Sequence, residues 1–126
     1  MIVNDGKLLI VKRADDDRYM PGIWEIPGGK LNEDEELLDG LIRETFEETG
    51  LGIVINREIS VRNFKIKKKE IEMHIYLCNA LNFNIKLSSE HSLYEWVEIE
   101  KAKEKISDFY YNEIEILLNL ENERWP

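Results

Sequence analysis

Three glutamates, Glu44, Glu47 and Glu48, stand at positions i, i+3 and i+4 of the sequence. On a helix this spacing places three carboxylates on one face, with neighbouring side chains about 5–6 Å apart. Carboxylates at this distance repel one another, and the C-terminal end of a helix is itself negative. Mg²⁺ takes carboxylate oxygens and keeps some of its waters, which phosphate oxygens can replace. The spacing therefore predicts a divalent-cation site suited to phosphate chemistry.

A glycine-rich loop, Pro27-Gly28-Gly29-Lys30, precedes the glutamates. Two glycines let the backbone turn sharply and approach a ligand closely, so a carbonyl of this loop could join the metal shell. Glu35 and Arg43 follow, and we predict an ion pair between them that ties the loop to the helix. Glu-rich helices are usually solvated faces and Gly-Gly pairs are usually turns. The combination of these features is therefore the specific signal.

The glutamates need a helix beneath them, and helical spacing of apolar residues runs over 34–49. The apolar positions are Leu37, Leu38, Leu41, Ile42 and Phe46. Asn32 is the expected N-cap, followed by acidic residues in the first turn, and Gly50 is the expected glycine after the helix. A short strand is predicted over 23–26, and it stops at Pro27. This order brings the loop to one end of the helix.

Strands dominate the rest of the predicted structure. Beyond the central region we expect strands over 2–3, 7–11, 53–64, 71–81 and 93–99, a helix start over 100–107 and a C-terminal helix over 112–120. An Asp5-Gly6 turn favours a hairpin between the first two strands. The basic stretch Lys65–Glu70 lies between the next two or within their hairpin. This order favours an α+β fold, an α-β-α sandwich with a mixed β-sheet packed between helices.

The bulk composition indicates a single domain over 1–126, with 43% hydrophobic residues to form a core. No apolar run approaches the ~20 residues of a membrane span. Because the N-terminus also lacks a signal-peptide pattern, a cytoplasmic protein is expected. The one cysteine, Cys78, lies among alternating apolar residues and is expected to be buried and inert. The net charge of −9 argues against nucleic acid or an anionic membrane as a partner.

The motif residues together resemble the Nudix box. Their order is Gly29, five residues, Glu35, seven residues, Arg43-Glu44, two residues, Glu47-Glu48, one residue and Gly50-Leu51. Every fixed position matches, and Thr45, where the family usually has an aliphatic residue, is β-branched and similar in size to valine. The segments 8–13, 22–30, 89–91 and 96–97 also look like the usual surroundings of the box. The chain therefore resembles the Nudix hydrolases, in particular MutT-like members.

The resemblance implies Mg²⁺- or Mn²⁺-dependent hydrolysis of a diphosphate bond in a nucleoside diphosphate derivative. The implied metal ligands are Glu44, Glu47, Glu48, Glu90 and the carbonyl of Gly28. Either Glu44 or Glu90 is the implied base that activates water, and the sequence does not choose between them. The implied structural positions of the motif are Gly29, Glu35, Arg43 and Gly50.

Substrate contacts are sought among cations and aromatic residues near these positions. Arg13 and Lys30 are the best-placed cations for substrate phosphates. Asn112 lies in the region where MutT-type members have an asparagine that reads the purine edge. Trp24 and Trp96 could stack a base, although a core position is expected for at least one of them.

Three further features are assigned less specific roles. His74 and His91 do not have the local spacing of a metal pair, and His91 is expected to be a loop or capping residue. The lysines of the stretch 65–69 could steer a phosphate or bind RNA, although a solvated hairpin tip is the more common outcome. The first hairpin arm, 1–3, is short for this fold. Either the natural start lies upstream, or the sheet edge is trimmed or completed by a second chain; an exposed edge favours a homodimer.

The substrate is predicted by elimination of subfamily markers. No proline lies between Pro27 and Pro126, where ADP-ribose pyrophosphatases tend to have one. The tyrosine typical of diadenosine tetraphosphate hydrolases and the coenzyme A marker are also missing. A nucleoside triphosphate, including non-standard or oxidised forms, is therefore predicted to give a monophosphate and pyrophosphate. The alternatives are an ADP-ribose or dinucleoside polyphosphate pyrophosphatase, an RNA 5′-end pyrophosphohydrolase, and a non-catalytic nucleotide-binding module.

Overall fold

The computed structural model describes the backbone of residues 1–124 and the side chains of residues 1–121. Its elements, in chain order, are β1 (Val3–Asn4), β2 (Lys7–Arg13), β3 (Trp24–Glu25), α1 (Leu37–Thr49), β4 (Ile53–Ile66), β5 (Lys69–Ala80), β6 (His91–Glu98), the 3₁₀ helices η1 (Ile99–Glu104) and η2 (Asp108–Tyr110), and α2 (Tyr111–Arg124). Among residues 1–124, no helix is both long and apolar enough to cross a membrane.

Strand β2 is the centre of the sheet. β6 pairs with β2 along its whole length, while β1 and β3 pair with the two ends of its other edge, all in antiparallel orientation. A parallel bridge between Ile2 and Cys78 joins these strands to the β4–β5 hairpin. The sheet is therefore mixed, as predicted.

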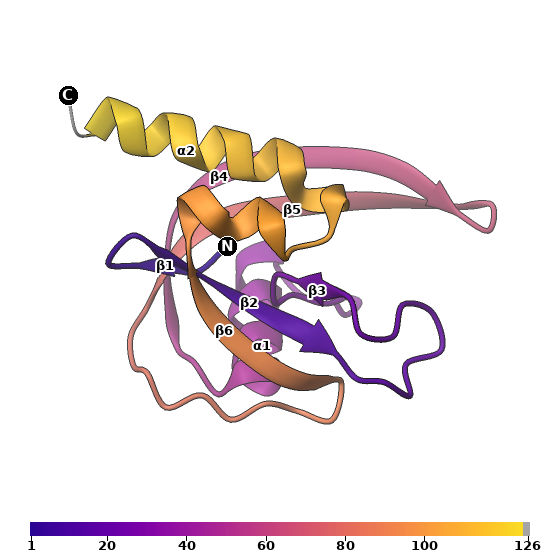
Figure 1. Cartoon of the computed structure of the whole chain (residues 1–126). Helices are drawn as coiled ribbons and strands as arrows, with labels where there is room; N and C mark the ends of the chain where they lie inside the picture. Colours follow the sequence, from indigo (N-terminus) through magenta and orange to yellow (C-terminus); the bar gives the residue numbers. More distant parts are fainter. Residues whose placement is uncertain (125–126) are drawn as a thin grey trace.

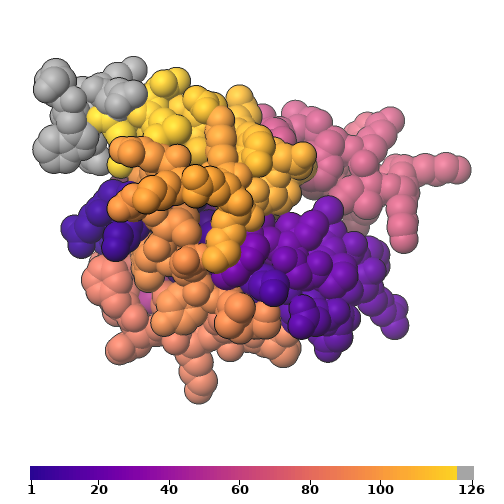
Figure 2. Space-filling view, in the orientation of Figure 1, coloured from indigo at the N-terminus to yellow at the C-terminus, as the bar shows by residue number. Residues whose placement is uncertain are grey.

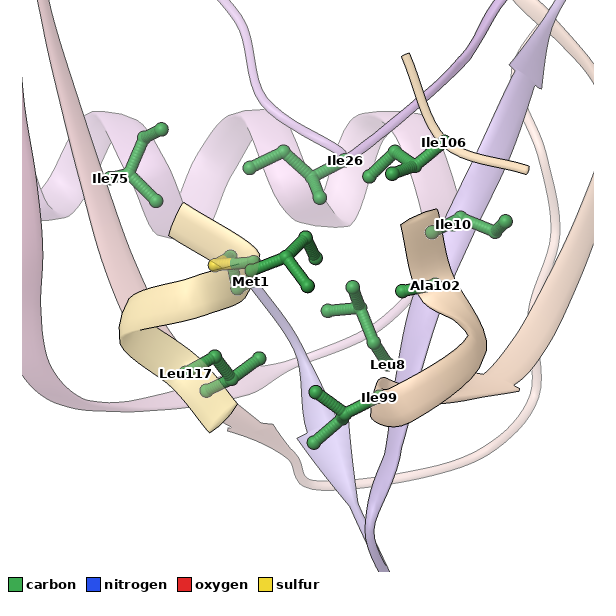
Figure 3. Packing of buried hydrophobic residues seen from close by; sticks show 10 residues of the cluster. Met1, Leu8, Ile10, Ile26, Ile75, Ile99, Ala102, Ile106 and Leu117 are labelled. Atoms are coloured by element: carbon green, nitrogen blue, oxygen red, sulfur yellow. The ribbon is translucent and has the colours of Figure 1, made fainter. Parts of the chain in front are cut away.

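Side chains of β2 alternate between two hydrophobic layers, because successive residues of a strand point to opposite faces. Leu8 and Ile10 enter a cluster beneath η1 and α2, whereas Leu9 enters a cluster on the α1 side of the sheet. Figure 3 shows the first cluster, with Leu8 beside Ile99. Figure 1 shows the resulting layers, with α1 behind the sheet and η1 and α2 on the other side. The predicted α-β-α sandwich is confirmed.

The β4–β5 hairpin is long and contains the lysine stretch. Its strands pair from Ile53 opposite Ala80 to Ile66 opposite Lys69, and a two-residue turn, Lys67-Lys68, joins them. In Figure 2 this end of the hairpin, in pink, projects from the body near the loop that follows β2. The Lys67 ammonium lies 5.5 Å from the ring centroid of Tyr19 in that loop. The hairpin tip and the loop therefore meet at one end of the molecule.

Helix α1 begins at Leu37 instead of Asp34, and its N-cap is Glu36 without a side-chain capping bond. The prediction of Asn32 as the N-cap is wrong. Asn32 and Glu35 instead form a separate turn, in which the Asn32 N–H donates to the Glu35 carboxylate (3.0 Å) and the Glu35 N–H donates to the Asn32 carbonyl (3.3 Å). The positive φ of Asp34, 65°, interrupts any continuous helix there.

The other end of α1 follows the prediction, because Gly50 is left-handed (φ 75°) and its N–H donates to the Phe46 carbonyl. The apolar spacing, however, does not identify the buried face. Leu38, Ile42 and Phe46 are exposed, and the buried positions are Gly40, Thr45, Glu48 and Thr49. Close packing requires glycine at position 40, since a side chain there would collide with Leu31.

The first hairpin arm does not lie at a sheet edge. The Met1 ammonium donates to the Tyr76 carbonyl (2.7 Å), the Cys78 N–H donates to the Met1 carbonyl (2.8 Å), and the Leu9 N–H donates to the Ile2 carbonyl (2.9 Å). This segment therefore lies between β2 and β5. The argument for a homodimer from an exposed edge at this arm is wrong, and the homodimer itself stays a prediction.

Several smaller predictions are decided by burial. Cys78 is 1% exposed, which confirms that the thiol is buried. Trp24 packs against the cluster beneath η1 and α2, and Trp96 packs against the cluster on the α1 side. The segment predicted to start a helix at Glu100 forms the short 3₁₀ helix η1, and the C-terminal helix extends beyond the predicted 112–120.

Candidate active site

Glu48 is the buried member of the three glutamates, with 4% of its surface exposed. Its carboxylate accepts a hydrogen bond of 2.8 Å from the Gly28 N–H, so the glycine loop contacts the helix face directly. Burial, together with the nearby Glu90 and Glu44 carboxylates, raises the pKa of Glu48 to about 8, although the hydrogen bond from the Gly28 N–H opposes the rise. A cation at this position would relieve both effects.

Glu90 reaches Glu48 from across the fold, as the resemblance implies. It precedes β6, and its carbonyl accepts the Ala14 N–H (2.9 Å). One potential ligand atom from each of Glu48, Glu90 and His91 lies within 4.8 Å of the others. The two carboxylates are ligands that Mg²⁺ or Mn²⁺ accept, whereas an imidazole suits softer divalent ions. The residues present therefore fit a divalent ion.

Arg43 binds the other two glutamates of the helix face, Glu44 and Glu47. Its guanidinium donates to both oxygens of Glu35 (2.8 and 3.0 Å), to Glu44 (2.9 Å) and to Glu47 (3.0 Å), and also to the Lys30 carbonyl (3.1 Å). The predicted Glu35–Arg43 ion pair is therefore present and ties the loop to the helix. The same guanidinium offsets part of the repulsion between Glu44 and Glu47. From the sequence alone, this compensation was assigned entirely to a metal ion.

Gly29 and Thr45 fit their positions sterically. A Cβ at Gly29 would overlap the Glu44 carboxylate, so only glycine leaves that side chain in place. Thr45 is 2% exposed, and its carbonyl accepts the Thr49 hydroxyl (2.7 Å). Threonine therefore fills the buried position that the family usually gives to an aliphatic residue.

A second polar network begins at His91. Its Nε2 lies 2.8 Å from the Glu25 carboxylate, which also accepts from Arg13 Nη1 (3.1 and 3.3 Å). Arg13 Nη2 donates to Asp17 (2.7 Å). Arg13, predicted as a phosphate contact, is thus held by two carboxylates. The predicted loop or capping role of His91 is wrong, because its side chain is buried between Glu25 and the metal-side glutamates.

A cleft of about 680 Å³ opens beside Arg13, Glu25 and the glycine loop, and the glutamates of α1, Glu90 and His91 are not among its lining residues. Its walls are β5 on one side and the loop 25–31 with the start of α1 on the other. Arg13 and Lys30 line the cleft, as do Tyr110 and His74. Asn112 is not among the lining residues; it is exposed, and its amide lies 3.5 Å from Glu113. Neither predicted stacking tryptophan lines the cleft.

Sequence reasoning missed three residues of this region, Glu25, His91 and Tyr110. Glu25 directly precedes the Ile26-Pro27 segment, and the pairing of β3 with β2 places it opposite Val11, two residues before Arg13 on the same strand. His91 adjoins Glu90, which is a signal that could have identified it. Tyr110 carries no comparable signal, because only the return of the C-terminal segment over the sheet brings it to the cleft.

An acidic helix face, a glycine loop that contacts it and an adjoining cleft, all on an α-β-α sandwich, define a metal-dependent hydrolase of phosphate anhydrides. Comparison with known proteins gives the same class. A NUDIX domain model matches residues 1–117, and the chain belongs to the NUDIX family. Hydrolases of this family use divalent metal ions. Membership of the family therefore identifies this chain as an enzyme of the pyrophosphohydrolase class.

Individual relatives agree with this assignment. The chain is 30% identical over 110 residues to a MutT-like protein of Streptomyces ambofaciens, covering 87% of this chain and 67% of the relative. It is 32% identical over 111 residues to the nucleoside triphosphatase NudI of Escherichia coli K12, covering 79% of each. A crystal structure of a MutT protein from Methanosarcina mazei Go1 has a TM-score of 0.76 at 29% identity, covering 98% of this chain and 88% of that chain. The solution structure of the E. coli ORF135 protein has a TM-score of 0.79 at 23% identity, covering 99% and 89%, which supports the fold alone.

Proposed function

We propose that this chain hydrolyses a nucleoside triphosphate to a nucleoside monophosphate and pyrophosphate, with Mg²⁺ or Mn²⁺ as the cofactor. The observation that carries the proposal is the meeting of Glu48, Glu90 and the Gly28 backbone beside a cleft of about 680 Å³. A cleft of this size is within the range that holds a small-molecule ligand. The nucleoside triphosphatase activity in the name of the NudI relative supports the choice of substrate.

The metal ligands in this proposal are Glu44, Glu47, Glu48, Glu90 and the Gly28 carbonyl. The bound ions would neutralise phosphate charge and make a coordinated water more acidic. Glu48 is held in place by the Gly28 N–H, so its direction is set before any ligand arrives. Either Glu44 or Glu90 accepts the proton of the attacking water.

The substrate contacts in this proposal are Arg13 and Lys30, which line the cleft, and Asn112 at the start of α2. Ion pairs with Glu25 and Asp17 fix the Arg13 guanidinium at the cleft wall, so little side-chain entropy is lost when phosphate binds. The protein is proposed to act on free nucleotides in the cytoplasm, since the charge of −9 opposes binding of long nucleic acids.

The proposal is tested by a substrate panel with Mg²⁺. The panel contains nucleoside and deoxynucleoside triphosphates, oxidised guanine nucleotides, ADP-ribose, dinucleoside polyphosphates and 5′-triphosphorylated RNA. Separate assays for pyrophosphate and orthophosphate identify the bond that is cut. We expect pyrophosphate from a triphosphate. Turnover of ADP-ribose, a dinucleoside polyphosphate or RNA in its place would replace the proposed substrate, and no turnover of any compound would favour a binding module.

A further inference from the structure

Glu25 occupies the centre of a polar network that none of the assigned roles explains. Its side chain is 16% exposed and contacts residues from two other strands. Arg13 of β2 donates to both of its oxygens, and His91 of β6 lies 2.8 Å from Oε2. The Glu25 carboxylate therefore contacts Arg13, which is a candidate to bind substrate phosphate. It also contacts His91, which is the sequence neighbour of the candidate metal ligand Glu90.

The outer end of the network is held firmly. Arg13 Nη2 donates to Asp17, and Asp17 also accepts the N–H groups of Tyr19 and Met20 (2.9 Å each). The guanidinium of Arg13 is thus fixed from two sides. Its Nε is buried, and among the described side chains it has no hydrogen-bond partner. Buried polar groups are normally paired, so this donor is one of the few exceptions among the described side chains.

The inner end of the network, at His91, also has a buried nitrogen without a hydrogen-bond partner among the described side chains. The His91 side chain is 1% exposed, and its Nδ1 is buried without a partner among residues 1–121. Because a carboxylate oxygen can only accept, Nε2 is the ring nitrogen that donates to Glu25. A ligand atom of His91 lies within 4.8 Å of both Glu48 and Glu90. Two unpartnered atoms therefore lie at opposite ends of one network, and Glu25 joins them.

We propose that Glu25 is a positioning residue of the hydrolase site, which holds Arg13 for the substrate phosphates and holds His91 against the metal-side carboxylates Glu48 and Glu90. The inference rests on the proposed function. It adds that the phosphate side and the metal side of the site are coupled through one side chain. Loss of the Glu25 charge then weakens binding on both sides.

The chemistry of the side chain explains why a carboxylate is needed. Arg13 and His91 both present N–H groups to Glu25, so both of its oxygens must accept. In Glu25→Gln one oxygen becomes an NH₂ donor, and that donor must face Arg13 or His91. The substitution preserves shape while it removes the charge and sets one donor against another. Residues that orient metal ligands in this manner typically change metal affinity about 10–100-fold when they are replaced.

The test uses full-length wild type, E25Q and the control E115Q, which removes a carboxylate from the exposed Lys103–Glu115 pair outside the cleft. Mn²⁺ affinity is measured from the electron paramagnetic resonance signal of the free ion. Affinity for a non-hydrolysable α,β-methylene nucleoside triphosphate is measured by calorimetry with Mg²⁺. We expect E25Q to weaken both affinities roughly tenfold or more. We expect E115Q to leave both within twofold of wild type.

A double-mutant cycle of Glu25→Gln and Arg13→Ala distinguishes a positioning role of Glu25 from a structural one. If Glu25 acts on phosphate through Arg13, then at a Mg²⁺ concentration that saturates both variants R13A/E25Q binds the analogue no more weakly than R13A does. Unchanged Mn²⁺ and analogue affinities in a folded E25Q, or analogue losses that add fully to those of R13A, would overturn the proposal. If E25Q does not fold, the same comparison is made with E25D, which keeps the charge but draws the carboxylate back by one methylene group. Failure of both variants to fold would assign Glu25 to stability alone.

The two proposals fail separately in this design. A wild-type protein that binds Mn²⁺ and the analogue but hydrolyses no nucleotide refutes the proposed function, and the E25Q comparison still reports on coupling. The Mn²⁺ measurement needs neither a substrate nor turnover.

Discussion

Glu48 is placed where its own charge is unfavourable. Burial and the neighbouring carboxylates raise its pKa from 4.5 to about 8. Between these two values the folded metal-free protein holds a proton that the unfolded chain has released. By linkage, the free energy of unfolding then decreases as pH rises through this window, by at most about 1.4 kcal/mol for each unit of pKa shift.

This residue gives the first prediction, which concerns stability against pH. In EDTA, urea unfolding of wild type should show stability falling between pH 5 and pH 8, because Glu48 must ionise while buried. Glu48→Gln removes the titrating group, so the difference in stability between wild type and E48Q should change over this range. Adding Mg²⁺ should reduce the decline in wild type. Parallel pH profiles for the two proteins would show that Glu48 does not titrate in this window.

Gly29 gives a second prediction at the residue scale. In Gly29→Ala the new methyl overlaps the Glu44 carboxylate and must displace it. Displacement of a catalytic group by about 1 Å can reduce turnover roughly 100-fold, so we expect a loss of about 10- to 100-fold in kcat/KM with little change in melting temperature. Gly52→Ala is the matched control, since its methyl meets Leu81 at an ordinary 3.4 Å. Equal activity of G29A and wild type would contradict the assigned position of Glu44.

At the scale of elements, the turn of the β4–β5 hairpin is strained. Lys67 and Lys68 have φ values of 48° and 68°, a left-handed conformation that asparagine and glycine adopt far more readily. We predict that K67N/K68G raises the free energy of unfolding by about 1 kcal/mol. The control K65Q/K69Q removes two lysine charges beside the turn without changing it. An equal gain in both variants would assign the effect to charge repulsion instead of backbone strain.

The elements show how far the sequence could predict the structure. Strong local signals succeeded: Asp5-Gly6 predicted the first hairpin, Gly50 predicted the end of α1, and the box predicted the loop–helix contact. These features depend on neighbours along the chain. The predicted start of α1 was wrong because the Glu35 side chain binds Asn32 and Arg43 in a separate turn. A turn of this kind leaves no periodic pattern in the sequence.

Long-range contacts account for the residues of the site that were missed. Glu25, His91 and Arg13 are far apart in sequence, and they meet only because β2 pairs with both β3 and β6. The exposed apolar stripe of α1 has a similar cause: spacing predicts a helix, but packing against the sheet determines which face is buried. The position of Tyr110 at the cleft depends on the path of the whole C-terminal segment.

At the scale of the whole molecule, one buried ion pair fixes α2 to the sheet. Glu113 has no exposed side-chain surface, accepts from Arg62 of β4 (2.7 Å) and accepts the Ser60 hydroxyl (2.8 Å). The Arg62 guanidinium also lies 4.1 Å from the centroid of the Phe109 ring. This contact connects the C-terminal helix to the strand that supports the cleft wall.

Removing one partner of this ion pair should therefore lower the free energy of unfolding strongly. We predict that Glu113→Ala lowers the free energy of unfolding by about 3 kcal/mol, because it removes the buried acceptor of both Arg62 and Ser60 and leaves the half-buried Arg62 without its ion-pair partner. The double variant R62M/E113L, which removes both charges, should recover most of the loss in urea unfolding. Glu115→Ala, on the same helix with an exposed partner, should change stability by less than about 1 kcal/mol. A loss in R62M/E113L as large as in E113A would refute this explanation.

The central claim is that the carboxylates around Glu48 make this chain a pyrophosphohydrolase. The most direct measurement is release of pyrophosphate from the preferred nucleoside triphosphate, with Mg²⁺, by wild type and by E48Q of matched thermal stability. We predict that wild type releases pyrophosphate and monophosphate in equal amounts and that E48Q loses turnover by 10²–10³-fold or more. Equal turnover by E48Q, or orthophosphate as the wild-type product, would contradict the account.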